Sequence, residues 1–387
     1  MHRIRRPCRW LTAVVLLLVA HAGAARAQGV DVRLQLQPEH ERQRARVMAA
    51  AERSVRECES WFGPPPTGRL LVVDRAWRSA PAPLPEPGVA VFDSRWLVTP
   101  ASMLPEASIA KAISRQWWGV RVPIADAALA GALVDYSAGL IVERLFADRM
   151  HRPGYTRLEL RFFDGFVPWA FRMPVLDRAG AARGGADRRL LTLERYLGWP
   201  ALQRALAAVA ARPSGGAPMS RDEFFAIAGD AVGQDLRWFP AAAFAPDGAI
   251  DYAIGDLTSV AASCQGHPCF RTTVVARRNG APFPGSARAP IGEYESGRAI
   301  ALAVTFADGT SASDTWDGRR ETMRFEYESR VPAVSASLDP DAMLLLDRRR
   351  ANNSRRLDST AAGAAAQWSL RWIVWLEDAL LAYASLA

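Results

Sequence analysis

The stretch Ile109–Val122, IAKAISRQWWGVRV, decides how the chain folds and what it does. Its apolar residues recur at helical spacing, and Lys111 and Arg115 fall one turn apart on one face of the predicted helix. The aromatic run QWWG follows directly. Paired side chains at this spacing hold metals or do acid–base chemistry when they are imidazoles or carboxylates, and here the stretch has neither.

The first 27 residues have the composition of an export signal. A basic start, the apolar run LTAVVLLLVA and the small-x-small sequence Ala25-Arg26-Ala27 predict a secretory signal peptide cleaved after residue 27. An uncleaved anchor is the alternative, although a span needs about 20 apolar residues. Without the five arginines of this segment the formal net charge falls from +8 to +3. We therefore expect a periplasmic or secreted protein, peripheral at the membrane at most, that binds no nucleic acid.

Cysteine usage fits an exported chain. Beyond the signal segment, Cys264 and Cys269 in SCQGHPCF are close enough to close a small loop in an oxidising compartment. We predict a disulfide between them, with two separate thiols near a turn as the alternative. A CxxxxC pair with one histidine between is poor material for a zinc site.

Periodicity divides the remaining chain into a mainly helical part and a β-rich part. Helical spacing runs over 41–62 and from Ser108 to about Phe244, with strand-like runs at 69–74 and near 89–100. Gly198 is predicted to divide two helices, and Ser220 with Glu223 has the spacing of a capping box. From about residue 250, alternating apolar runs and Asx-Gly turn signals predict four to six antiparallel strands, AMLLLDRRR among them.

Residues 357–387 are predicted to form a linker and a C-terminal amphipathic helix. Trp368, Trp372 and Trp375 recur at helical spacing, but Glu377 and Asp378 interrupt the apolar face. A membrane-spanning role is therefore disfavoured. Docking on the protein and lying in a membrane interface both remain open.

Several separated motifs resemble one protein family. QWWG at 116–119 resembles the end of the HExxHQWWG helix of the membrane alanyl aminopeptidase family, which are gluzincin zinc metallopeptidases. DYSA at 135–138 resembles the end of that family's WLSEGLAEYSA helix. LLTLERYLGWPALQRALAAV, the segment around SRDEFF, VTFADGT and LDPDAMLLLDRRRANNS follow in the family's order, so the resemblance covers about residues 41–356.

The resemblance implies an α+β fold. A mainly helical, thermolysin-like (gluzincin) peptidase domain with a small edge sheet is expected over 28–249, followed by an antiparallel β-sandwich over 250–356. The large β-domain that precedes the catalytic domain in this family has no room in the dozen or so residues after the signal segment.

Carried over residue by residue, the resemblance implies a site without its chemistry. The first histidine ligand falls on Lys111, the general-base glutamate on Ala112 and the second histidine on Arg115. The glutamate ligand falls on Gly131, and the transition-state tyrosine falls at or beside Arg183. Two cations in place of imidazoles would repel a dication, and arginine stays charged in proteins. We therefore expect no metal, no cofactor and no proteolysis.

The inherited cleft is still a candidate peptide site. A strand edge there would hold an extended peptide through backbone hydrogen bonds. In PGVAVF, alanine or valine replaces the glutamate that holds the substrate's amine in this family. The candidate contacts are Val89, Ala90, Val91, Trp117, Asp135 and Tyr136. Trp117 and Trp118 are interpreted first as residues that pack the helix in the core, with substrate contact as the other role. Lys111 and Arg115 either face solvent or occupy the former metal cavity, where an internal ion pair with carboxylates such as Asp135 or Glu143 would replace the metal.

The sequence therefore predicts an exported, non-catalytic relative of zinc aminopeptidases that binds a peptide or an envelope partner. The alternative is a divergent metallo-aminopeptidase or other peptidase with residual activity. A third hypothesis is a membrane-associated accessory protein that contacts the bilayer through Trp368, Trp372 and Trp375. No strand-turn-helix GxSxG element and no phosphate-cradling glycine loop is visible.

Overall fold

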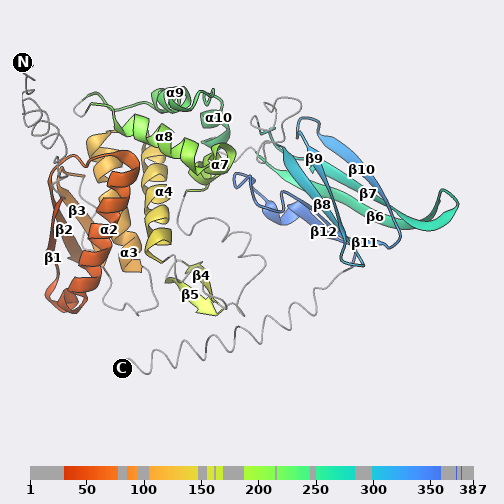
Figure 1. The fold of residues 1–387 in the computed structure, drawn as a ribbon, viewed down its shortest axis with the longest axis horizontal. Coiled ribbons are helices and arrows are strands. Elements are labelled where there is room, and N and C mark those ends of the chain that lie inside the picture. Colours follow the sequence, from red (N-terminus) through yellow and green to blue (C-terminus); the bar gives the residue numbers. More distant parts are fainter. Residues whose placement is uncertain are drawn as a thin grey trace, which may run out of the picture.

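A computed structural model describes residues 30–76, 85–94, 104–146, 187–213, 216–244, 250–283 and 299–358, with Trp372 and Leu376, and the backbone alone of 155–160 and 163–168. The predicted signal peptide, Arg183, Trp368 and Trp375 lie outside the described residues. Within them, a mainly helical body lies beside a β-rich body (Figure 1).

A three-stranded parallel sheet forms one side of the helical body. Its strand order is β1-β2-β3, with β1 at Asp31–Gln35, β2 at Arg69–Ala76 and β3 at Val89–Ser94. Between β1 and β2 the chain crosses over through helix α2, Arg44–Phe62, which is the usual way to join parallel neighbours. Strand β3 is therefore an edge strand of this sheet.

Six further α-helices of this body lie in the described residues; α2 and α3 stand beside the sheet, and α4 packs against these two helices (Figure 1). The six are α3 (Leu104–Ser114), α4 (Ala127–Leu145), α7 (Arg188–Leu197), α8 (Trp199–Ala210), α9 (Arg221–Val232) and α10 (Phe239–Ala243). Gly198, at a φ of 80°, separates α7 from α8 as predicted. The Ser220 hydroxyl accepts from the Glu223 amide at 3.2 Å and so caps α9, which confirms that helix start.

The helical prediction for 108–244 missed one hairpin. Strands β4 (Tyr155–Leu160) and β5 (Phe163–Pro168) pair antiparallel, with Leu160 opposite Phe163. The period-2 alternation of YTRLEL is a strand signal, but it is short and stands between two long helical segments. The β5 strand lies near α3.

The β-rich body consists of two antiparallel sheets with a common core. The first has the order β10-β7-β6 and the second β12-β11-β8-β9. The strands are β6 (Tyr252–Cys264), β7 (His267–Arg278), β8 (Ile300–Phe306), β9 (Ser311–Trp316), β10 (Thr322–Ser329), β11 (Ala333–Leu338) and β12 (Ser354–Arg356). Buried Leu257 and Val274 of the first sheet share one cluster with Leu302 and Val304 of the second, as in a sandwich.

The segment AMLLLDRRR, predicted to be a strand, is instead an irregular connection. The Asp339 carboxylate accepts from the amides of Met343 and Leu344 at 2.7 and 3.0 Å, and the Asp347 carboxylate accepts from Tyr252 and Arg349. The bonds from Met343, Leu344 and Arg349 are local and occupy backbone amides that a strand would offer to a neighbour. The run is apolar because its residues pack in the interior, and a short apolar run of this kind predicts a strand from sequence.

The two bodies meet around Trp238, which packs against both apolar clusters. Its ring lies edge-on to Tyr196 and to Phe283, with centroids 5.3 Å apart in each case. Buried Ala342 and Leu345 of the irregular connection also join the core of the helical body. None of the helices in the described ranges is long and apolar enough to cross a bilayer.

Candidate functional site

Gln116, the first residue of QWWG, ties the end of α3 to the start of β3. It is 2% exposed, and its side-chain oxygen accepts from the Gly88 amide at 3.0 Å. Its side-chain nitrogen donates to the carbonyls of Glu86 and Val89 at 3.1 and 2.7 Å. Gly88 turns there at a φ of +74°, where a Cβ would meet the Arg69 carbonyl oxygen at 2.9 Å. Sequence reasoning had assigned Gln116 no such role.

The two tryptophans that follow are also interior residues. The Trp117 indole donates to the Gly63 carbonyl at 2.9 Å, where α2 ends. The Trp118 indole donates to the buried Ser137 hydroxyl at 2.9 Å. QWWG and DYSA are thus joined to each other by a hydrogen bond between α4 and the turn after α3. Packing and hydrogen bonding account for the aromatic pair.

These facts correct three of the candidate peptide contacts. Trp117 and Tyr136 are both 0% exposed, and the Tyr136 hydroxyl donates to the Glu194 carboxylate at 2.7 Å. Ala90 is 1% exposed, so its side chain is unavailable as well. Their side chains bind within the fold and cannot line a peptide.

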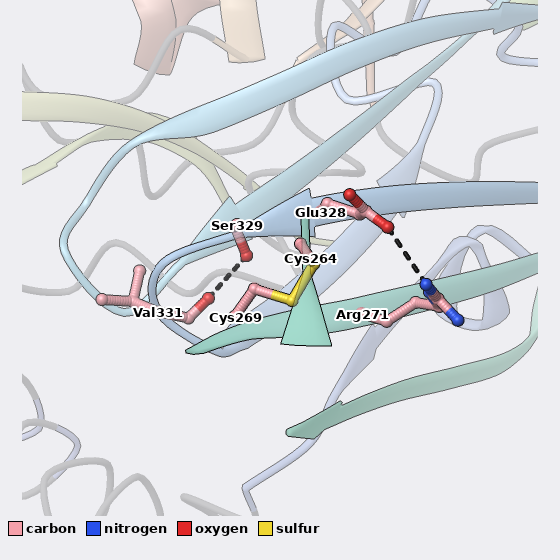
Figure 2. Close-up of a disulfide and its surroundings, with 6 residues drawn as sticks. All are labelled: Cys264, Cys269, Arg271, Glu328, Ser329 and Val331. Carbon is pink, nitrogen blue, oxygen red and sulfur yellow. Dashed lines mark hydrogen bonds and ion pairs between the residues drawn. A yellow bond between two sulfur atoms is a disulfide. The ribbon is translucent and has the colours of Figure 1, made fainter. Parts of the chain in front are cut away.

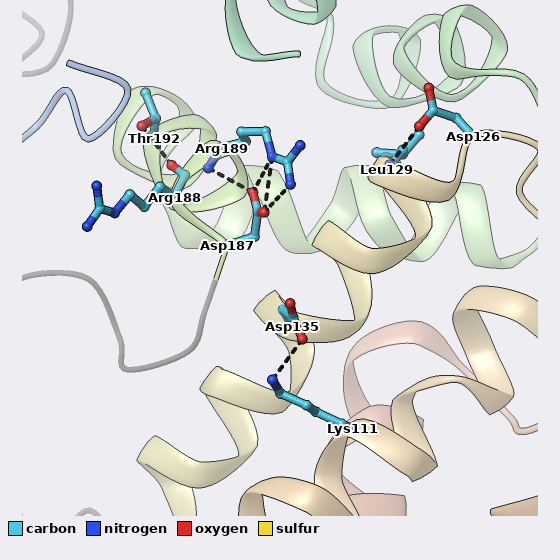
Figure 3. Close-up of polar contacts among 8 residues, drawn as sticks. All are labelled: Lys111, Asp126, Leu129, Asp135, Asp187, Arg188, Arg189 and Thr192. Carbon is cyan, nitrogen blue, oxygen red and sulfur yellow. Dashed lines mark hydrogen bonds and ion pairs between the residues drawn. The ribbon is translucent and has the colours of Figure 1, made fainter. Parts of the chain in front are cut away.

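Unlike these buried residues, Lys111 and Arg115 have side chains exposed at the surface. The Lys111 ammonium forms an ion pair with the Asp135 carboxylate on α4 at 3.0 Å. Figure 3 shows these two side chains pointing toward each other. The two side chains are 38% and 41% exposed, so the pair is at the surface instead of in the interior. Arg115 is exposed and makes no ion pair with any residue that the structure describes. Lys111 therefore has the predicted partner Asp135, but the pair is exposed and the prediction of an internal pair is wrong, whereas Arg115 faces solvent.

The remaining two positions of the motif have small side chains in opposite settings. Ala112 is 2% exposed and belongs to the core of the helical body. Gly131 is exposed on α4, one turn before Asp135, and a Cβ added there would meet nothing within 4 Å. We call the surface formed by Lys111, Arg115, Gly131 and Asp135 the α3–α4 face.

A charged pair at the start of α7, Asp187 with Arg189, lies near Asp135 of this face (Figure 3). Asp187 caps α7 by accepting from the Arg189 amide, and its carboxylate pairs with the Arg189 guanidinium. That hydrogen bond raises the pKa of Arg189, and the carboxylates of Asp126 and Asp135 add to the effect. Arg189 therefore lies within electrostatic reach of Asp135.

Asp126 caps α4 and pairs with Arg221 of α9. Burial acts to raise the pKa of Asp126, but the bonds from the Leu129 amide and Arg221 outweigh burial and lower it. The guanidinium groups of Arg189 and Arg221 lie 4.6 and 4.4 Å from the ring centre of Phe244. The Asp126–Arg221 ion pair and the two cation–π contacts with Phe244 thus hold α7, α9 and the start of α4 together.

The β3 edge offers backbone groups that point away from the sheet. The Leu71 amide donates to the Gly88 carbonyl, so even-numbered residues of β3 face β2 and odd-numbered ones face outward. The outward groups of Val89 are already taken, since its amide donates to Glu86 and its carbonyl accepts from Gln116. The next outward-facing residue is Val91, which is half-buried. Of the three valine and alanine candidates, Val91 alone keeps a backbone position suited to a peptide.

A disulfide joins Cys264 and Cys269 near the tip of the β6–β7 hairpin (Figure 2). Gln265 and Gly266 form the turn with φ of 50° and 84°, as a tight two-residue hairpin requires. The structure therefore has the predicted pairing. Cys58 is buried and free, and burial raises the pKa of its thiol to about 12.

In the described part of the chain, no cluster of three or more histidine, cysteine, aspartate or glutamate side chains is placed to hold a metal ion.

Comparison with known proteins shows a distant likeness in fold. The chain is similar to the crystal structure of Legionella pneumophila aminopeptidase A in complex with aspartic acid, with a TM-score of 0.51 and 14% sequence identity. The match covers 82% of this chain and 36% of that one, so this chain spans about a third of that structure. No protein-family model and no curated protein matches the sequence. The fold is therefore aminopeptidase-like, with mixed helices and sheets of the α+β class.

Proposed function

We propose that this chain is a degenerate gluzincin that has lost its zinc site and binds an extended peptide or a segment of an envelope partner without cleaving it. One contrast supports the proposal. The motif residues that match the aminopeptidase family, Gln116, Trp118 and Ser137, are buried and hydrogen-bonded within the fold. The positions that would carry the chemistry have other side chains, among them Lys111 and Arg115.

The residues on the α3–α4 face do not fit a zinc ion. Zinc takes neutral imidazole, thiolate or carboxylate ligands. Here an ammonium and a guanidinium stand at the two imidazole positions, and Gly131 offers no side-chain ligand. The Lys111 ammonium also neutralises the Asp135 carboxylate, which is the acidic side chain of this face. No step of a metal-assisted hydrolysis is therefore assigned to these residues.

Peptide binding would use the outer edge of β3. An extended peptide added beside Val91 gains backbone hydrogen bonds in the way an extra strand does. Proline at Val91 would remove the outward amide and leave the bonds to β2 in place, because those come from Ala90 and Phe92. Proline at Val32 is the matched control, since that residue faces outward on β1 at the other edge of the same sheet.

The test is peptide binding by fluorescence anisotropy with a fluorescein-labelled heptapeptide library. We expect Val91→Pro to weaken binding of the selected peptide by about tenfold or more, and Val32→Pro to leave it unchanged. N-methylation of alternate peptide amides should also abolish binding. If no peptide binds the native chain, or if the Val32 and Val91 variants behave alike, binding at the β3 edge is excluded.

A divergent peptidase is the rival function. It predicts turnover of aminoacyl fluorogenic substrates that a chelator abolishes and that Lys111→Ala or Arg115→Ala changes. Our proposal predicts no turnover above a heat-denatured control.

We also propose export and a peripheral membrane contact through the C-terminal tryptophans. Trp372 and Leu376 are 42% and 54% exposed and lie one helical turn apart, which supports an apolar contact outside the described fold. Co-sedimentation with anionic vesicles should be lost on deletion of residues 366–387. Peptide affinity should stay the same in that deletion. Vesicle binding that survives the deletion would rule out the tail as the contact.

A further inference from the structure

The α3–α4 face has an excess of positive charge. Lys111 and Arg115 lie on one face of α3, since the Arg115 amide still donates to the Lys111 carbonyl at 3.3 Å. Asp135 compensates Lys111, and Asp187 compensates Arg189. Arg115 has no acidic partner in the described ranges, so one cation at this surface is left over.

The face also has space beside its cations. Gly131 lies exposed one turn before Asp135 and therefore on the same side of α4. A Cβ placed on Gly131 would have no neighbour within 4 Å, so an incoming group can approach the helix backbone there. Asp135 itself is 41% exposed and leaves the Lys111 ammonium reachable from solvent.

We infer that the α3–α4 face binds a carboxylate of a bound peptide, through the guanidinium of Arg115 with Lys111 beside it. A guanidinium matches a carboxylate with two parallel hydrogen bonds and keeps its charge at any physiological pH. This inference rests on the proposed peptide binding and names the ligand class. The carboxylate is either the peptide's C-terminus or an aspartate or glutamate side chain, which share this chemistry.

Three substitutions on the face test the inference, because two of them should erase the preference for an acidic peptide and one should increase it. Arg115→Gln removes the unpaired cation. Gly131→Glu places a carboxylate on the same face, at an exposed helix position where an added Cβ would meet nothing within 4 Å. Asp135→Asn removes the acid that competes for Lys111. Arg348→Gln is the matched control, because Arg348 is an exposed arginine of the β-rich body.

The experiment uses the heptapeptide selected from the library in four forms. These carry a free C-terminal acid, a C-terminal amide, an amide with an internal aspartate, and an amide with an internal asparagine. We expect one acidic form to bind the native chain about tenfold more tightly than its neutral twin, and which form does so identifies the source of the carboxylate. Arg115→Gln and Gly131→Glu should erase that preference, Asp135→Asn should increase it, and Arg348→Gln should leave it intact.

Two failures are distinguishable. If neutral and acidic forms bind the native chain equally well, the carboxylate site is refuted while peptide binding stands. If no form binds, the peptide-binding function is refuted and the site with it. Circular dichroism melting of each variant separates loss of binding from loss of fold. A preference for acid that survives both Arg115→Gln and Gly131→Glu also refutes the inference.

Discussion

At the scale of single residues, the motif around QWWG separates packing from chemistry. Gln116 makes three side-chain hydrogen bonds to the backbone around the start of β3. Lys111, one and a half turns earlier, makes a solvent-exposed ion pair. Exposed pairs contribute about 0 to 1 kcal/mol, whereas a buried polar group left without a partner costs about 1 to 3 kcal/mol. Gln116 should therefore matter more for stability than the charged residue that first draws attention.

Substitution of Gln116 tests this ranking. We expect Gln116→Leu to lower the free energy of unfolding by about 2 to 4 kcal/mol, because the Gly88 amide and the Val89 carbonyl lose their partner. Gln203→Leu, on the half-buried side of α8, should change it by less than about 0.5 kcal/mol. Lys111→Ala should cost about 1 kcal/mol or less. Urea unfolding measures all three changes. Equal effects of the two glutamine substitutions would contradict a stabilising role for the Gln116 hydrogen bonds.

The Cys58 thiol gives a second prediction at this scale. It is 0% exposed, and burial raises its pKa to about 12, so the reactive thiolate is scarce at neutral pH. Iodoacetamide at pH 8 should leave Cys58 unlabelled in the native protein and label it in urea, as peptide mass mapping would show. Rapid labelling without denaturant would contradict its burial.

At the scale of elements, most helices and strands could be predicted from local signals. Gly198 and the Ser220 cap fixed helix boundaries because their effect is local. The β4–β5 hairpin and the irregular run AMLLLDRRR at 342–350 could not, since the first depends on pairing within a helical setting and the second on the carboxylates of Asp339 and Asp347. The exposed positions of the candidate site could be named from the resemblance. Packing of Trp117 is one of the two roles that the sequence predicts, and its bond to the end of α2 confirms it. Burial of Tyr136 could not be predicted, because it depends on contacts with α7.

The start of α4 has a pH-dependent prediction. The pKa of Asp126 is lowered in the folded chain, so its contribution to stability is present above the unfolded pKa and is lost as the pH falls through the folded pKa. Asp126→Asn keeps a capping side chain but removes the charge that pairs with Arg221. We expect it to cost about 1 kcal/mol at pH 7. That difference should shrink in acid, and a difference that grows as the pH falls would contradict this sign.

At the scale of the whole molecule, the two bodies are joined by Trp238 and by the connection that follows β11.

Asp347 lies in this connection. Burial raises the pKa of its carboxyl group, although the hydrogen bonds from Asn353 and two backbone amides oppose the shift. A raised pKa means that the contribution to stability is present below the unfolded pKa and is lost as the pH rises through the folded pKa. The advantage of the native chain over Asp347→Asn should therefore be larger at pH 4 than at pH 7. Urea unfolding at both values checks this, and the reverse order would contradict it.

The proposed function assigns peptide binding to a chain with an aminopeptidase-like fold and a charged α3–α4 face. Because the likeness in fold comes with 14% identity, the positions of the site rest on the motifs QWWG and DYSA. If those motifs place the site correctly, restoring its ligands should restore metal binding. Lys111→His, Arg115→His and Gly131→Glu together supply the two imidazoles and one carboxylate of a zinc site.

Zinc content per chain, measured by mass spectrometry of metal ions after dialysis, compares this triple variant with the native protein. We predict well below one zinc ion per native chain and about one per chain of the triple variant. The variant should keep this zinc in the presence of an equimolar colorimetric chelator. A native chain that retains about one zinc would contradict the proposed loss of the metal site. A folded triple variant that binds none would contradict the placement of Lys111, Arg115 and Gly131 around one former site.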